Sequence, residues 1–220
     1  MKKHTALIFD MDGTLVHNMP IHNQAWKDTL AEAGVQIDVD EFHRATVGKK
    51  SYEIMRLMLG PERSEAELLS WGERKENLYR ERFSALRAPL PGLLPLLEQA
   101  QALGIPMAVA SAAPPENLSF ILDELDLRRF FNVVVGGHNI QNGKPDPEIF
   151  LLSAQMMGVE PSACLVFEDA LAGVEAARRA GMEAVFLCTS HTADEVAGMA
   201  HVLHAVPDFT SLDLSALLGS

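Results

Sequence analysis

The chain has 220 residues, 48% of them hydrophobic, and its 30 acidic against 18 basic side chains give a formal net charge of -12. This composition suits a globular protein with its own core, and the negative charge and absence of a long apolar segment argue against nucleic-acid and membrane partners. Cys164 and Cys188 lie inside apolar runs, so we expect buried thiols and a cytoplasmic location. We also expect a monomer or weak homodimer.

Short runs that are apolar throughout are typical of strands buried on both faces of a parallel sheet. Such runs occupy residues 6–9, 107–110, 133–135, 164–167 and 184–187. Helical patterns at residues 93–103, 147–157 and 170–180 supply the crossovers that parallel strands need. Asp146 is placed to cap the second of these helices, and Gly181 to end the third. The sequence therefore predicts an α/β fold, a Rossmann-like parallel sheet flanked by helices.

One stretch interrupts this alternation with helical patterns alone. It carries a helical spacing over residues 21–33, Ser51 as a cap for residues 52–59, and a capping box formed by Ser64 and Glu67. The turn-rich residues 89–92 then lead back to the sheet. We predict an α/β core of residues 1–16 and 89–220, with an inserted all-helical domain of residues 17–88.

Two acids end the first predicted strand. Because side chains alternate along an extended segment, Asp10 and Asp12 can face the same side. Gly13 permits the turn that follows, and Thr14 offers a hydroxyl to an oxyanion. Asp and Gly are also ordinary turn residues, so this motif alone leaves a simple turn as the alternative.

Other polar residues are expected at the same edge of the sheet. Ser111 follows the second strand, Lys144 precedes the helix of residues 147–157, and Glu168 and Asp169 end the fourth strand. Singly, each has a structural explanation: a serine after a strand, a surface lysine, acids that cap a helix. Together they place acid, hydroxyl and cation where open α/β sheets bind ligands, and Asp10 with the later acids could bind Mg²⁺.

Residues 9–15, Ser111, residues 143–150 and residues 167–170 resemble, in order, the four motifs of the haloacid dehalogenase superfamily. The helical insertion resembles the C1 cap of that superfamily, and the similarity is strongest to its β-phosphoglucomutase-like phosphatases. The resemblance implies that Asp10 attacks phosphorus and that Asp12 is the general acid and base.

The resemblance also implies a ligand set. Ser111, Ala112 and Lys144 would bind phosphate oxygens. Mg²⁺ would be bound by Asp10, the carbonyl oxygen of Asp12, and Asp169, with Glu168 nearby. The cap and loop residues expected to contact substrate are His22, Trp26, Gly48, Lys49, Lys50, Lys75 and Asn117. Some also have ordinary explanations, since Trp26 suits a helical core and Lys75 an exposed helix face.

Two departures from the mutase pattern favour hydrolysis of a small phosphorylated metabolite, such as a sugar phosphate. Ser51 stands where the mutase has a phosphate-binding arginine, and the loop after Ser111 looks longer and retains only Asn117. A β-phosphoglucomutase remains the alternative. Asp12 argues against dehalogenation. Three other classes of protein are also disfavoured. A signalling receiver would carry its phosphate-accepting aspartate on a later strand, and a non-catalytic module would lose these motifs. A dinucleotide-binding domain would have a glycine fingerprint after the first strand, which is missing here.

Overall fold

The computed structural model describes residues 3–46 and 51–219. The chain divides into two compact units, called here unit 1 (Met1–His17 and Ala88–Ser220) and unit 2 (Asn18–Arg87). Each is described by itself. Within the described residues, no helix is long and apolar enough to cross a membrane.

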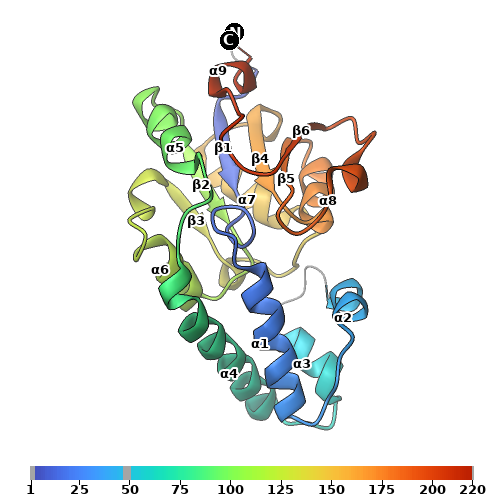
Figure 1. The fold of residues 1–220 in the computed structure, drawn as a ribbon. Helices are drawn as coiled ribbons and strands as arrows, with labels where there is room; N and C mark the ends of the chain where they lie inside the picture. Colours follow the sequence, from blue (N-terminus) through green and yellow to red (C-terminus); the bar gives the residue numbers. More distant parts are fainter. Residues whose placement is uncertain (1–2, 47–50, 220) are drawn as a thin grey trace. The chain divides into compact units, whose positions relative to one another are not determined.

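Unit 1 is built on a parallel sheet in which β1 lies at the centre (Figure 1). The strands are β1 (Ala6–Phe9), β2 (Met107–Ala110), β3 (Val133–Val135), β4 (Cys164–Glu168), β5 (Glu183–Leu187) and β6 (Val202–Val206). Their order is β3-β2-β1-β4-β5-β6. The first five were predicted to within one residue. The edge strand β6 was missed because it is half-exposed and contains His204, so its apolar pattern is interrupted.

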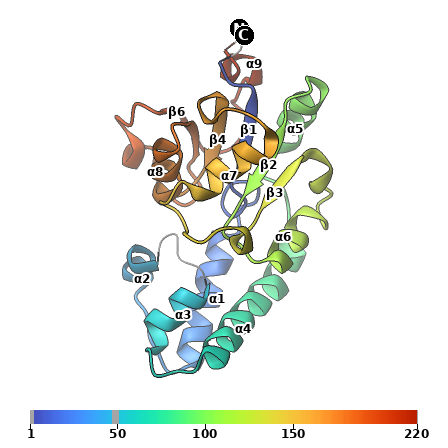
Figure 2. The same ribbon diagram turned by 180° about the vertical axis from the view of Figure 1, so that it is seen from behind.

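Helices connect these strands, and one further helix follows the last strand (Figure 2). They are α5 (Leu93–Ala102), α6 (Pro115–Leu122), α7 (Glu148–Met157), α8 (Leu171–Arg179) and α9 (Leu214–Leu217). Short 3-10 helices span Arg128–Phe130, Gly137–Asn139, Pro161–Ala163 and Ala193–Val196. Gly181 follows the end of α8 with a φ of +73°, as predicted for a terminating glycine. Asp146 is not the N-cap of α7, which begins only at Glu148, but its Oδ1 accepts a hydrogen bond from the Glu148 N–H at 3.0 Å.

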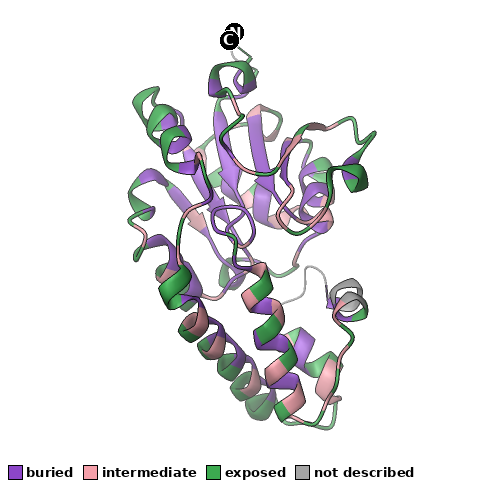
Figure 3. Ribbon diagram, viewed as in Figure 1, coloured by how far each residue is buried: buried purple, intermediate pink, exposed green. Residues whose placement is uncertain are grey.

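Alternate residues of β1 pack on opposite faces of the sheet. Ala6 and Ile8 belong to a buried cluster that includes Phe150 of α7. Phe9, on the opposite face, stacks on Phe167 of β4 with 4.5 Å between ring centroids. Figure 3 shows the central strands as buried, so this part of the sheet is covered on both faces and its polar residues lie at the strand ends.

Among its described residues, unit 2 contains helices and no strand. Its helices are α1 (Met19–Glu32), α2 (Val39–Thr46), α3 (Ser51–Leu59) and α4 (Glu65–Phe83), followed by a 3-10 turn at Ser84–Leu86. The predicted capping box at Ser64 and Glu67 is confirmed at the start of α4. Ser51 is the first residue of α3 rather than the cap before it, and its hydroxyl donates to Glu76 Oε1 at 2.6 Å. The helix α2 was not predicted.

Candidate active site

Three of the predicted site residues of unit 1 lie at strand ends where the strand order of the sheet reverses direction. From β1 the chain runs outward to β2 and β3, then returns to β4 on the other side. Asp10 directly follows β1, Ser111 directly follows β2, and Glu168 is the last residue of β4. The carboxyl ends of parallel strands at such a reversal are where ligands bind in open α/β sheets.

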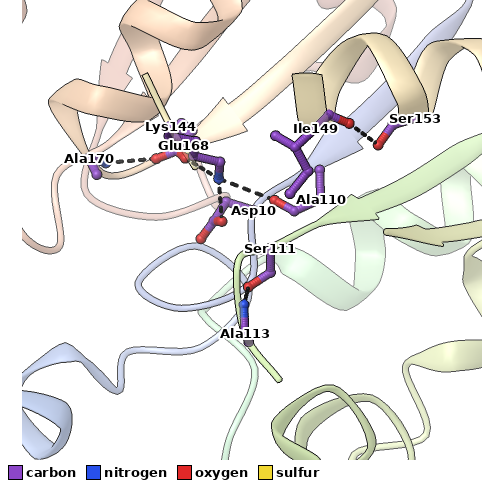
Figure 4. A network of polar contacts seen from close by, with 9 residues as sticks. All are labelled: Asp10, Ala110, Ser111, Ala113, Lys144, Ile149, Ser153, Glu168 and Ala170. Atoms are coloured by element: carbon purple, nitrogen blue, oxygen red, sulfur yellow. Dashed lines mark hydrogen bonds and ion pairs between the residues drawn. The ribbon is translucent and has the colours of Figure 1, made fainter. Parts of the chain in front are cut away.

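The ammonium of Lys144 lies between two carboxylates (Figure 4). Lys144 Nζ donates to Asp10 Oδ1 and to Glu168 Oε1, each at 2.6 Å, and to the carbonyl oxygen of Ala110 at 3.1 Å. All three charged side chains are buried. Hydrogen-bonded ion pairs of this length are charge-assisted, and burial shields them from water, so the geometry of the three groups is tightly defined.

Glu168 is held on both of its carboxylate oxygens. Its Oε2 accepts a hydrogen bond from the main-chain N–H of Ala170 at 2.8 Å, while Oε1 receives Lys144. The carboxylate also lies against Gly173 of α8, where an added Cβ would be 1.8 Å from Glu168 Oε1. A glycine is needed at this position because any side chain would displace Glu168.

The site contains more acidic than basic side chains, and the pKa values of these side chains are shifted accordingly. Burial, together with the charges of Glu168 and Asp12, raises the pKa of Asp10 to about 7, although Lys144 opposes this shift. Burial and the charges of Glu168 and Asp10 raise the pKa of Asp169 well above its usual range. Burial alone would lower the pKa of Lys144, but Asp10 and Glu168 raise it above its ordinary value. The carboxylates would be stabilised by a further cation.

The donor set fits one kind of cation in particular. Among the described residues, no group of three or more histidine, cysteine or acidic side chains is arranged to hold a metal ion. Such a group is not needed for Mg²⁺, which is usually bound by one or two carboxylates and keeps several water ligands. Asp10 and Asp169 can supply two carboxylates. Glu168 is the weaker candidate because its oxygens already accept from Lys144 and Ala170.

The loop after β1 carries the second predicted catalytic acid. Asp12 is half-buried and pairs through its main chain with Val16, and Gly13 turns the chain with a φ of +82°. Thr14 is completely buried, and its hydroxyl has no hydrogen-bond partner among the described residues. Asp12 and Asp10 are close enough for their charges to interact.

The loop after β2 carries two of the predicted phosphate-binding residues, Ser111 and Ala112, and leads directly into α6. Ser111 is buried, and its Oγ accepts a hydrogen bond from the Ala113 N–H at 3.2 Å. The helix α6 begins at Pro115, and Asn117 lies buried in its first turn. Ala112 lies in the short connection, with its carbonyl oxygen packed against Gly137.

Three residues predicted to contact substrate come together inside unit 2. Lys75 Nζ lies 2.8 Å from His22 Nδ1 and 4.7 Å from the centre of the Trp26 ring. Lys75 also donates to Glu76 Oε1 at 3.0 Å and is only 2% exposed, so it does not lie on an exposed helix face. The other cap residues predicted for this role, Gly48, Lys49 and Lys50, lie outside the described residues.

Several residues at these sites were not predicted from the sequence. Glu76, the partner of Ser51, was overlooked because a glutamate in a charged helical run normally faces solvent. Thr189 and Ser190 were overlooked although they follow β5, whose carboxyl end shares the edge of the sheet with Asp10. The position of the strand end was the signal that could have found them.

Fold and site together define a class: a parallel α/β enzyme with an acidic centre at the strand reversal and a helical unit inserted after its first strand. A sequence model of the haloacid dehalogenase-like hydrolases matches residues 4–181. The chain therefore belongs to the haloacid dehalogenase-like hydrolase family.

Characterised relatives are similar over most of the chain. The fructose-1-phosphate phosphatase YqaB of Escherichia coli (strain K12) is 36% identical over 84% of this chain and 96% of its own. A phosphorylated carbohydrates phosphatase of Thermotoga maritima is 34% identical over 82% of this chain and 83% of its own. Among solved structures, a β-phosphoglucomutase from Clostridium difficile matches with a TM-score of 0.84 and 27% identity, covering 97% of this chain and 95% of the other.

Proposed function

We propose that this protein is a Mg²⁺-dependent phosphatase that hydrolyses the phosphate monoester of a small sugar through an aspartyl-phosphate on Asp10. The observation that carries the proposal is the buried Asp10 carboxylate, held by Lys144 at the carboxyl end of β1 with Asp12 two residues further on. The names of the Escherichia coli and Thermotoga maritima relatives support a phosphorylated carbohydrate as substrate.

The two acids divide the chemistry between them. A carboxylate oxygen of Asp10 attacks phosphorus, the bond from phosphorus to the sugar oxygen breaks, and protonated Asp12 gives its proton to that oxygen. In the second half, Asp12 takes a proton from water while the water oxygen attacks phosphorus. The bond from phosphorus to Asp10 then breaks, so inorganic phosphate leaves and both acids return to their starting states.

The remaining residues of the site neutralise and position the phosphate. Lys144 is buried and held by Asp10, Glu168 and the Ala110 carbonyl oxygen, so its positive charge lies at a fixed position beside Asp10. The hydroxyl of Ser111 and the main chain at Ala112 are suited to donate to the same oxygens. When bound, Mg²⁺ would supply positive charge to the phosphate and to the crowded carboxylates. We assign it to Asp10, Asp169 and the carbonyl oxygen of Asp12, with Glu168 as a neighbour that holds Lys144.

We further propose that unit 2 is the cap and that the sugar contacts His22, Trp26 and Lys75. Further contacts are proposed for Asn117, Gly48, Lys49 and Lys50. An aromatic ring beside a buried lysine and imidazole suits a hydroxylated sugar better than a second anion. Glu76, which accepts from both Ser51 and Lys75, balances the charge of Lys75. This balance favours a monophosphate, and hence hydrolysis over the mutase reaction, which must retain a bisphosphate.

Phosphate release from hexose monophosphates, fructose 1-phosphate first, tests the catalytic proposal. Asp10→Asn should abolish Mg²⁺-dependent release, with a loss of at least about 10³-fold, because the nucleophile is gone. Asp146→Asn is the matched control, since Asp146 is near Lys144 in sequence and an asparagine can still accept from the Glu148 N–H. A folded Asp10→Asn enzyme with full activity would overturn the proposal.

The charge balance between Lys75 and Glu76 is tested by comparing a bisphosphate with a monophosphate as substrate. Glu76→Gln leaves Lys75 with an uncompensated charge, so the kcat/KM for fructose 1,6-bisphosphate relative to fructose 1-phosphate should rise about tenfold, the equivalent of about 1.4 kcal/mol. An unchanged ratio would remove the argument from Glu76. Rapid conversion of β-glucose 1-phosphate to glucose 6-phosphate with little free phosphate, given a trace of the 1,6-bisphosphate, would instead establish the mutase.

The state of the two thiols supports a proposal about the compartment. Cys164 and Cys188 are both free, and burial raises the pKa of Cys164 to about 11. Unreactive, reduced cysteines are compatible with the cytoplasmic location that we propose.

A further inference from the structure

Two adjacent hydroxyl residues after β5 contact both of the loops that would carry the metal ligands. Thr189 Oγ1 donates to the carbonyl oxygen of Gly13 at 2.5 Å. Ser190 Oγ donates to Asp169 Oδ2. One short segment therefore holds the loop after β1 and the acid after β4 at the same time.

We propose that Thr189 and Ser190 are positioning residues that fix Asp169 against the turn at Gly13 and so pre-form the Mg²⁺ site. The inference rests on the proposed function, because it assigns Mg²⁺ to Asp169 and to the carbonyl oxygen beside Gly13. Neither hydroxyl is placed in contact with substrate or with the reacting atoms.

Close packing at Gly13 supports the proposal. A Cβ added to Gly13 would lie 2.0 Å from Asp169 Oδ2, so the carboxylate occupies space that any other residue would fill. The oxygen that lies against Gly13 is the same one that accepts from Ser190. Gly13, Asp169, Ser190 and Thr189 thus form a closed ring of contacts, and a shift of any one of them would disturb the others.

Electrostatics explains why such a ring is needed. Asp169 is 3% exposed and lies near the charges of Glu168 and Asp10, which repel its carboxylate. A hydroxyl donor offsets part of this repulsion and fixes the direction in which the carboxylate points. Partners of this kind behind a metal ligand change metal affinity by about 10–100-fold when they are removed.

The segment itself is firmly anchored, as a positioning element must be. The Cys188 N–H donates to the carbonyl oxygen of Val206 in β6 at 2.8 Å, and the Thr189 N–H donates to the Leu187 carbonyl oxygen at 2.9 Å. The hydroxyls therefore extend from the end of the sheet rather than from an unsupported loop.

Mg²⁺ binding to the whole protein, measured by calorimetry with the metal alone, tests the role of Ser190. Ser190→Ala should raise the dissociation constant for Mg²⁺ about 10–100-fold, while kcat at saturating Mg²⁺ changes much less. Ser190→Thr keeps the hydroxyl and should restore affinity. Ser153→Ala is the control, because Ser153 is also a buried serine, its hydroxyl donating to the Ile149 carbonyl oxygen at 2.8 Å in α7, and its loss should leave Mg²⁺ affinity unchanged (Figure 4).

Thr189 is tested by a different readout. Thr189→Val keeps the shape but removes the donor to Gly13, so Asp12 is held less well and kcat should fall several-fold, with Thr189→Ser restoring it. Wild-type Mg²⁺ affinity in Ser190→Ala, in an enzyme that binds Mg²⁺ and releases phosphate, would overturn this inference alone. A wild-type protein that neither binds Mg²⁺ nor releases phosphate would overturn the proposed function and the inference with it.

Discussion

Each unit of the molecule contains a buried lysine, and the two lysines are paired in different ways. In unit 1, Lys144 Nζ contacts two carboxylates, those of Asp10 and Glu168, each at 2.6 Å. In unit 2, Lys75 Nζ contacts one carboxylate, that of Glu76, at 3.0 Å and an imidazole nitrogen of His22 at 2.8 Å. Both ammonium groups are shielded from water, so the difference lies in their partners.

The difference between the partners of the two lysines indicates which kind of ligand each site is suited to bind. Around Lys144 the acids outnumber the cation, and burial together with neighbouring acids raises the pKa of Asp10 to about 7. Such a site gains from a further positive charge. Around Lys75 a single carboxylate balances a single ammonium beside an aromatic ring, so that site gains little from another ion of either sign. This difference supports our proposal that phosphate chemistry takes place at the first site and that the second site recognises an uncharged sugar.

The largest expected effect comes from replacing Lys144, the lysine that contacts two carboxylates. Lys144→Met leaves Asp10 and Glu168 buried without their cation, which should lower the free energy of unfolding by about 3–5 kcal/mol. Activity should fall by at least about 10²-fold because the charge facing the phosphate is lost. Urea unfolding without metal, and phosphate release with Mg²⁺, measure the two effects.

Lys75→Met provides the comparison in unit 2. It should cost less stability than Lys144→Met, because only Glu76 loses its cation and Ser51 still donates to it. The double variant Lys75→Met with Glu76→Gln should recover about 1–2 kcal/mol, since the uncompensated charge is removed as well. Equal losses for the two lysine variants would contradict the comparison.

Two glycines in helices, Gly173 in unit 1 and Gly72 in unit 2, test the same comparison between the units, with a smaller expected effect. Gly173→Ala places a Cβ 1.8 Å from Glu168 Oε1, so it must displace the carboxylate that holds Lys144. We expect a net loss of about 1–3 kcal/mol and reduced activity, even though alanine favours helices by about 1 kcal/mol.

The matched control is Gly72→Ala in α4 of unit 2. The nearest atom to its added Cβ is Ser51 Cβ at 3.8 Å, an ordinary contact. This variant should be neutral or more stable by up to about 1 kcal/mol. Thermal unfolding of both variants measures the difference, and a stabilised, fully active Gly173→Ala would show that Glu168 is not confined as described.

The sequence predicted the framework of unit 1 well because its signals are local. Continuous apolar runs identify buried parallel strands, and acids at the ends of such runs, as at Asp10 and Glu168, must share an edge of the sheet. The partners of Lys75 could not be predicted, since the burial of Glu76 depends on how α1, α3 and α4 pack. Ser190 lies between these cases: its position after a strand was visible, but its contact with Asp169 needed the register of the sheet.

The smallest expected effect concerns a third lysine, which is exposed. Lys3 Nζ donates to Glu183 Oε1 at 2.6 Å, and buried His4 Nε2 lies 2.9 Å from Glu183 Oε2. Burial acts to raise the pKa of Glu183, but the hydrogen bonds and charges of Lys3 and His4 outweigh it and hold that pKa below its usual value. The fold is thus stabilised above the unfolded-state pKa of about 4.3, and this contribution is lost as the pH falls through the lower folded-state pKa.

Glu183→Gln removes that contribution, so its cost should be greatest near neutral pH and shrink as the pH falls below about 4. A partly exposed pair is screened by water, and we expect at most about 1 kcal/mol. Urea unfolding of the wild type and the variant between neutral and acidic pH gives the difference curve. Raising the salt concentration should flatten this curve, because ions screen Lys3, which is 60% exposed on its side chain, far more than they screen Lys144 at 8%. A difference that grew toward acidic pH would mean that Glu183 is destabilised in the fold rather than stabilised by its partners.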